Sequence, residues 1–450
     1  MKLAGMLLGA ALALSAASND SFLIRNVDVY PVTAPEMKGV SLLVQDGKIA
    51  DIGPKVVAPK GVPGIVGKGL RVYPGWIDSA TALGLSEITE SIREATDTNE
   101  LGEFMPQLKA ITSVNPTSVH FPVVRVNGVT AAITMPSLGA TSGGGGGGRG
   151  GAGERQYIGG QAALIHTDGW TWEDMSVNPG VAMHLNFPTM GGRGGRGGGA
   201  PAEAPVADVG GGTAAGATQA RRAYEDQITH ISQFFDDARN YQKLKAAHLP
   251  GFKTDLKFEA MLPVLDGKVP LAIMAARATM IHDAIQFGDK QRVKIVIMEP
   301  RELGKAAAEL KEKNIPVILG KPLSLPEYED DPYDSSYTLP AEAYKAGVKF
   351  AFGSFENQFV RNLPYQAAAA VAFGLPNDEA LKALTINPAQ IWGVADQIGS
   401  VEKGKWADLI VADGDPLEIQ TGIKHIYIKG KEVELETRQR QMYDKYLNRP

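Results

Sequence analysis

The sequence predicts an α/β fold in which a (β/α) barrel carries a small β-domain built from both chain ends. Three observations predict it. Short apolar strands alternate with helices from about residue 73 to residue 397, which is typical of a parallel sheet or barrel. Residues 20–72 and 398–433 are instead dominated by short strands and turns. The length of 450 residues suffices for both units, because a single α/β barrel accounts for most of it.

Composition excludes several classes of function. Hydrophobic residues make up 44% of the chain and charged residues 21%, which is ordinary for a globular protein. The formal net charge of -5 gives no basic excess for a nucleic-acid partner, and no zinc-finger or RNA-binding signature is present. The chain has no cysteine, which removes disulfides, thiolate metal sites and a cysteine nucleophile.

The first 17 residues are typical of an export signal. Lys2 supplies a positive charge, residues 3–14 are apolar, and Ser15-Ala16-Ala17 offers small residues for cleavage. The apolar run is shorter than the about 20 residues that a membrane span needs. A buried N-terminal helix is the alternative. We therefore expect a periplasmic or secreted protein that begins near Ser18 and has no membrane span.

Both β-rich ends show strand patterns. Strands are expected at 22–32, 40–44, 49–52 and 69–73 near the start, and at 407–411, 425–428 and around residue 433 near the end. The Asp46-Gly47 dipeptide between two apolar runs is a strong hairpin signal. Two β-rich ends that flank one central body often form one split domain. A helical tail is expected at 434–450.

The central body contains six clear strands and several helices. The strands are expected at 129–135, 181–186, 271–274, 295–298, 317–319 and 350–352. The helices are expected at 217–244, 276–287, 302–313, 364–373 and 376–384. An open Rossmann sheet is the alternative, but it would need Gly-x-Gly-x-x-Gly after its first strand, and the sequence lacks this motif there.

Two glycine-rich inserts interrupt the central body, at 141–153 and 191–216. Runs of glycine lose too much entropy on ordering to pack, so we expect loops. Each insert follows a predicted strand, and the loops that follow barrel strands gather at the mouth. A phosphate cradle is less favoured, because six consecutive glycines specify no turn.

Three motifs carry a resemblance to a known family. Residues 73–78, Tyr-Pro-Gly-Trp-Ile-Asp, open the barrel, and Asn127-Gly128-Val129-Thr130 enters a later strand. A closing stretch begins at Ile398-Gly399-Ser400 and ends near Asp415-Pro416. Together they resemble the amidohydrolase superfamily, with imidazolonepropionase-like members the nearest match. The resemblance implies a (β/α)8 TIM-type barrel with a split β-sandwich, and hydrolysis of C–N bonds with zinc or another divalent metal.

The resemblance also implies five metal-ligand positions, but the usual ligands are absent from them. A His-x-His pair would point into the barrel from the first strand, because alternate residues of a strand share a face. Ala80 and Ala82 occupy these two positions. Met274 and Glu299 occupy the histidine positions of the fifth and sixth strands, and Phe355 replaces the aspartate of the eighth. We therefore expect neither a metal nor another cofactor.

Four side chains remain candidates for a pocket. His166 is expected in a loop at the mouth, and His184 on a strand that could face the barrel. Glu299 and Arg277 are expected near the carboxyl ends of adjacent strands. There they would either bind a polar substrate or form a structural ion pair. For any isolated histidine, a buried or surface role without chemistry is favoured. A serine-hydrolase elbow, Gly-x-Ser-x-Gly, is absent.

Three functions remain open, because fold alone does not choose between them. The first is an altered superfamily member without metal-dependent hydrolysis, which binds a small molecule or forms a homo- or hetero-oligomer with an active relative. The second is a hydrolase with a rearranged site, in which Glu299 is base or ligand with help from His166 or His184. The third is an envelope binding or scaffold protein that acts through the glycine-rich inserts. We rank them in this order.

Overall fold

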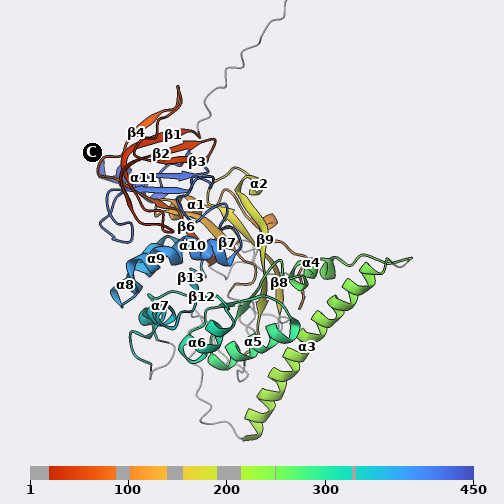
Figure 1. Ribbon diagram of the computed structural model, residues 1–450. Coiled ribbons are helices and arrows are strands. Elements are labelled where there is room, and N and C mark those ends of the chain that lie inside the picture. Colours follow the sequence, from red (N-terminus) through yellow and green to blue (C-terminus); the bar gives the residue numbers. More distant parts are fainter. Residues whose placement is uncertain are drawn as a thin grey trace, which may run out of the picture.

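A computed structural model describes residues 20–87, 102–138, 156–189, 214–248, 250–326 and 331–449. Figure 1 shows a β-rich unit at one end of the molecule and helices around a second sheet. The predicted export signal lies outside the described residues. So do the two glycine-rich inserts, except for residues 214–216, which begin a helix.

One eight-stranded sheet combines strands from the beginning and the end of the described chain, in the order β16-β15-β14-β5-β1-β2-β3 with β4 beside β1. The strands are β1 (Phe22–Val29), β2 (Met37–Gln45), β3 (Lys48–Gly53), β4 (Gly64–Val66), β5 (Arg71–Pro74), β14 (Leu409–Ala412), β15 (Ile423–Ile428) and β16 (Lys431–Glu432). Antiparallel pairing of β5 with β14, with Leu409 opposite Pro74, joins the two segments. Apolar side chains from both segments share one core. The limits of the split domain stay a prediction.

The predicted Asp-Gly hairpin between β2 and β3 is confirmed. Asp46 and Gly47 have φ values of 50° and 76°, as a tight two-residue hairpin turn requires. A side chain at residue 47 would also place its Cβ 2.4 Å from the carbonyl oxygen of Lys429. Glycine is therefore needed both for the turn and for the close approach of the β15–β16 hairpin.

The second sheet forms a nearly closed barrel of eight strands in the order β6 to β13. The strands are β6 (Trp76–Thr81), β7 (Val129–Thr134), β8 (Ile158–His166), β9 (Ser176–Asn186), β10 (Leu271–Met274), β11 (Ile295–Met298), β12 (Val317–Leu319) and β13 (Phe350–Phe352). The last four agree residue for residue with the predicted strands. Apolar side chains from the barrel strands fill the interior. The predicted TIM-type barrel is thus confirmed.

One strand departs from the expected strand–helix alternation. β8 runs antiparallel to both β7 and β9, whereas the other neighbouring strands of the barrel are parallel. Gly159 and Gly160 interrupt the apolar pattern of β8 in the sequence. Gly160, with φ of 134°, lies where a Cβ would be 2.8 Å from the carbonyl oxygen of Leu108. The glycine therefore serves a close backbone approach that the pattern alone did not indicate.

The barrel closes between β6 and β13 through a short seam. The amide of Phe355 donates to the carbonyl of Ala80 at 2.8 Å, and the amide of Ala82 donates to the carbonyl of Glu356 at 3.2 Å. Asp78 completes the seam, because its carboxylate accepts the amide of Ser354 at 2.9 Å and also the Ser354 hydroxyl. The first and last strands are thus held together largely at their carboxyl ends.

Helices cover the outside of the barrel (Figure 1). The described α-helices are α1 (His120–Arg125), α2 (Trp172–Met175), α3 (Ala214–Ala246), α4 (Leu256–Leu265), α5 (Ala278–Gln291), α6 (Leu303–Glu312), α7 (Ser335–Ala346), α8 (Leu363–Ala372), α9 (Asn377–Leu384), α10 (Ile386–Ile391) and α11 (Arg438–Leu447). Of these, α11 lies beside the β-rich unit (Figure 1). Among the described residues, no helix combines the length and apolar character that crossing a bilayer requires.

Candidate functional site

The five positions implied by the resemblance gather at the carboxyl ends of the barrel strands. Ala80 lies near the end of β6 and Ala82 directly after it, and Met274 ends β10. Glu299 directly follows β11, and Phe355 lies just after β13. Active sites of such barrels lie at this face, so the geometry expected of a site is retained even though its usual ligands are not.

Apolar atoms fill the space between these positions. Built onto Gly353, a Cβ would lie 2.9 Å from Phe355 Cε2, 2.9 Å from Ile318 Cγ2 and 3.0 Å from Ala80 Cβ. The three side chains therefore converge on one glycine. At the end of β11, the residue paired with Ile318 is Met298, which is fully buried. The inner layer of the mouth is consequently lined by methyl, thioether and aromatic groups.

A divalent metal does not fit these residues. Such an ion needs several imidazole or carboxylate ligands converging at about 2 Å. Within the ranges that the structure describes, no three His, Asp or Glu side chains are grouped closely enough to hold a metal. Glu299 is the single carboxylate among the five positions, and its neighbours in the set supply no donor. We therefore derive no chemical step through a metal at this site.

Left-handed backbone marks three of the strand ends at the mouth. Ser137, Glu299 and Phe355 follow β7, β11 and β13, with φ values of 60°, 50° and 53°. Residues other than glycine in this region cost on the order of 1–3 kcal/mol each and cluster at binding and active sites. Glu299 also lies close over Gly320, where a Cβ would be 2.9 Å from its Oε1 atom. The Glu299 side chain therefore lies against the end of β12, and its backbone conformation carries some energetic cost.

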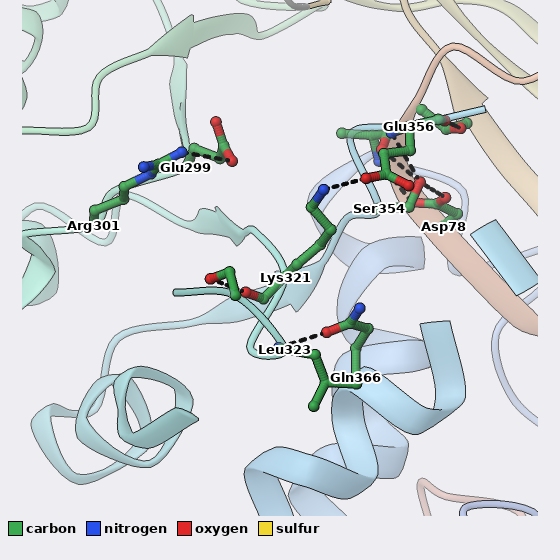
Figure 2. A network of polar contacts seen from close by, with 11 residues as sticks. Asp78, Glu299, Arg301, Lys321, Leu323, Ser354, Glu356 and Gln366 are labelled. Atoms are coloured by element: carbon green, nitrogen blue, oxygen red, sulfur yellow. Dashed lines mark hydrogen bonds and ion pairs between the residues drawn. The ribbon is translucent and has the colours of Figure 1, made fainter. Parts of the chain in front are cut away.

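A polar network borders the apolar layer (Figure 2). Lys321, which follows β12, donates to a carboxylate oxygen of Glu356, which follows β13. Glu299 faces Arg301 in a longer ion pair of 3.7 Å. Figure 2 shows the Lys321 side chain reaching toward Glu356 and Ser354, with the Glu299 pair on the other side. These half-buried charges are groups that could contact a polar ligand.

Asp78 is the carboxyl of the network whose pKa is shifted most. Burial raises its pKa to about 7, and the negative charge of Glu356 adds to the rise. Hydrogen bonds from Ser354 and from the amide of Ala80 oppose it. The Asp78 side chain is fully buried in the seam. The raised pKa therefore means that Asp78 holds a proton inside the structure where the barrel closes, away from solvent.

His184 lies inside the barrel. It is fully buried on β9, opposite Ala272 of β10 and two residues after the core residue Ala182. Burial lowers its pKa to about 4, although a contact with the Pro136 carbonyl opposes the shift. Neither ring nitrogen has a hydrogen bond of normal geometry. His184 is therefore a neutral imidazole in an apolar environment.

His166 does not lie in a loop at the mouth, contrary to our expectation. It ends β8, and because this strand is antiparallel, His166 lies at the opposite end of the barrel, across from Ala131. Its Nε2 atom is 2.8 Å from a carboxylate oxygen of Asp408, and both side chains are buried. The other Asp408 oxygen accepts the amide of Lys429 at 2.8 Å. The pair thus connects the barrel to the first sheet.

The proposed pairing of Glu299 with Arg277 stays a hypothesis. Arg277 is the residue before α5 and is half-buried, whereas Glu299 forms an ion pair with Arg301. Sequence reasoning missed Lys321, Glu356 and Ser354. Each lies within a few residues of a strand end, and that position was the only available signal.

A cavity of about 630 Å³ opens at the other face of the barrel, at the amino ends of β10, β11 and β12. Its lining includes Val181, Lys268, Pro270, Lys294, Pro316 and Trp392. Residues at this face of a barrel usually serve stability. The cavity is remote from the strand ends where Glu299 and Lys321 lie, so we place the candidate site at the mouth.

Comparisons with known proteins agree with this architecture. The sequence profile of the Amidohydrolase family matches residues 210–433. An amidohydrolase from Thermotoga maritima is 26% identical and superposes with a TM-score of 0.74, covering 92% of this chain and 99% of that one. The amidohydrolase tasK of Hapsidospora irregularis is 22% identical over 414 residues, which are 86% of this chain and 39% of the relative.

A shorter match links the chain to a named enzyme. The imidazolonepropionase of Porphyromonas gingivalis is 40% identical over 81 residues, or 17% of this chain and 19% of the relative. The chain thus spans well under two thirds of the length of the curated relatives it matches. A prolidase with a bound phosphonate ligand, at 16% identity and a TM-score of 0.53, shares the fold.

Proposed function

This chain belongs to the amidohydrolase superfamily, and we propose that it is a member without metal-dependent hydrolysis. It would act at the cell envelope, either by binding a small polar molecule at the barrel mouth or as a partner subunit of an active relative. The convergence of Phe355, Ile318 and Ala80 on Gly353 carries the proposal. Apolar side chains take the space where metal ligands would have to meet.

The polar border of the mouth supports ligand binding. Lys321 and Glu356 offer one cation and one anion at neighbouring strand ends, and Glu299 and Arg301 offer a second pair. Half-buried charges bind polar groups more strongly than fully exposed ones, because water screens them less. A ligand with amide or charged groups would therefore be favoured over an apolar one.

Metal analysis of the purified full chain tests the proposal. After incubation with zinc and removal of the free ion, we expect far less than one zinc per chain and no hydrolysis of a panel of dipeptides and hydantoins. Stoichiometric zinc together with hydrolysis would overturn the proposal. Size-exclusion chromatography with light scattering of the chain from its own cell extract tests the partner subunit, and a monomer there would exclude it.

Ligand binding is tested separately, by calorimetry with the same panel. Lys321→Ala should weaken the binding of any hit at least tenfold, because a charge-assisted contact contributes about 1.5–3 kcal/mol. Lys403→Ala, at an exposed lysine of a surface loop, is the matched control and should leave binding unchanged. Equal binding by both variants would place the ligand away from the mouth.

A hydrolase with a rearranged site is the second candidate, and one observation favours it. Glu299 keeps a left-handed backbone at a strand end of the mouth, and such strained positions cluster at active sites. If the panel shows metal-independent hydrolysis, Glu299→Gln should abolish it, since a general base must carry its negative charge. Unchanged turnover by this variant would remove Glu299 from the reaction.

A further inference from the structure

Helix α11 differs from the other long helices because it contributes nothing to a core. All ten residues from Arg438 to Leu447 are exposed. A side-chain cap starts the helix, since Thr437 accepts the amide of Arg440 at 3.2 Å. Isolated helices shorter than about 12 residues are marginal in water, and most helices gain their stability by packing an amphipathic face. A surface that receives α11 would therefore stabilise it.

The helix does have an apolar face. With 3.6 residues per turn, Met442, Tyr443, Tyr446 and Leu447 lie on one side of α11. Their exposed fractions are 38%, 64%, 55% and 65%. Two of the four are tyrosines, which suit a boundary between apolar and aqueous media because their rings are apolar and their hydroxyls are polar.

Cations border this apolar face on both sides. Three cationic residues belong to α11, namely Arg438, Arg440 and Lys445, and Arg449 follows its end. At 100° per residue, Arg440 follows Leu447 on one border, and Arg438 and Lys445 precede Met442 on the other. Lys445 and Arg449 also lie 5.9 Å and 5.2 Å from the ring of Tyr446. Asp444, the one acid of the helix, is on the polar face. The helix is thus basic, although the whole chain has a formal charge of -5.

We propose that α11 binds the protein to an anionic lipid surface. The apolar face would lie at the boundary between headgroups and acyl chains, and the bordering cations would reach the lipid phosphates. This arrangement of an apolar face, flanking Lys and Arg and a polar back is typical of interfacial helices. A second copy of the chain fits less well, because four side chains bury far less than the roughly 800 Å² per partner of a stable interface.

Cosedimentation of the full chain with vesicles tests the proposal. We expect binding to phosphatidylcholine vesicles that contain phosphatidylglycerol, little binding to pure phosphatidylcholine, and loss of binding as salt is raised. Replacing Arg438, Arg440, Lys445 and Arg449 with glutamine should weaken partitioning steeply, by about fivefold for each charge near the surface. Tyr443→Ser with Tyr446→Ser should weaken it as well, because both remove apolar contact.

A matched control separates the helix from net charge. Four exposed lysines elsewhere, Lys38, Lys268, Lys305 and Lys403, are replaced by glutamine to give the same charge. This control should still bind, and thermal unfolding should be unchanged in the α11 variants, since no α11 residue is buried. Equal binding to neutral vesicles, or equal loss in the control, would overturn the proposal. The proposal would also be overturned if the protein did not bind vesicles and instead formed a dimer that depended on α11.

Discussion

Replacing Asp78 by asparagine should change how stability responds to pH. In the folded protein the pKa of Asp78 is about 7, compared with 3.8 in an unfolded chain. The folded state therefore holds a proton that the unfolded state has released between these values. Stability from this group is greatest at low pH and is lost as pH rises toward 7.

The magnitude follows from the two pKa values. Each unit between them corresponds to 1.36 kcal/mol, so the full window amounts to about 4 kcal/mol. Between about pH 5 and about pH 8 the loss is about 2–3 kcal/mol. Asparagine can keep the bonds from Ser354 and Ala80 through its carbonyl oxygen, and its NH2 group can donate to the Ser354 hydroxyl. Asp78→Asn should therefore remove the pH dependence without opening the seam.

The assay compares variant and parent, because the pH dependence of stability that His184 contributes has the opposite sign to that of Asp78. Its folded pKa of about 4 lies below the value of 6.5 for histidine in an unfolded chain, so stability from His184 is lost as pH falls through that window. Absolute stability would thus change little, but the stability of Asp78→Asn relative to the parent should rise by about 2–3 kcal/mol from about pH 5 to about pH 8. For a chain of this size that is about 2–3 °C in thermal midpoint.

Asp51→Asn, at a half-exposed aspartate of β3, is the control and should track the parent. Parallel curves for parent and Asp78→Asn at every pH would refute the reasoning, because they would show that Asp78 does not titrate in this window. A variant destabilised equally at all pH values would mean that the asparagine breaks the seam.

Three further predictions concern buried groups. His184→Leu removes an imidazole that resists protonation, so the variant should gain stability over the parent near pH 5 but not near pH 8 in urea titrations. Asp408→Ala leaves His166 buried without its partner, and should cost about 2–3 kcal/mol in thermal unfolding; a smaller cost would mean that the pair does not hold the two sheets together. Gly353→Ala forces a methyl group against Phe355 and should cost about 1–3 kcal/mol, so an unchanged midpoint would contradict the tight packing there.

The parts of the fold that were predictable are those specified by local patterns. β10 to β13 are short apolar runs, and each is buried in the barrel along its length or nearly so. The Asp46-Gly47 turn needs positive φ at both positions, and the Asp-Gly dipeptide itself indicates this requirement. The absence of the usual metal ligands stays a prediction, which was made from the residues expected at the strand ends.

Other features depend on residues far apart in the chain. β8 was missed because two glycines mask its pattern and its partners are set by pairing with β7 and β9. The seam between Asp78 and Ser354 joins residues separated by 276 positions, and no local motif predicts this contact. The ion pair of Lys321 with Glu356 is likewise a product of neighbouring strand ends. The polar contacts at the mouth could therefore be described only once the arrangement of the barrel strands was known.

The pairing of β5 with β14 also bears on how the protein is made. Pro74 lies opposite Leu409, so most of the chain must be synthesised before this edge of β5 finds its neighbour. At 5–20 residues per second, the wait is on the order of tens of seconds. Throughout it, the nascent β5 presents unpaired backbone groups that can recruit other strands. A chain truncated before β14 would keep that edge of β5 unpaired permanently.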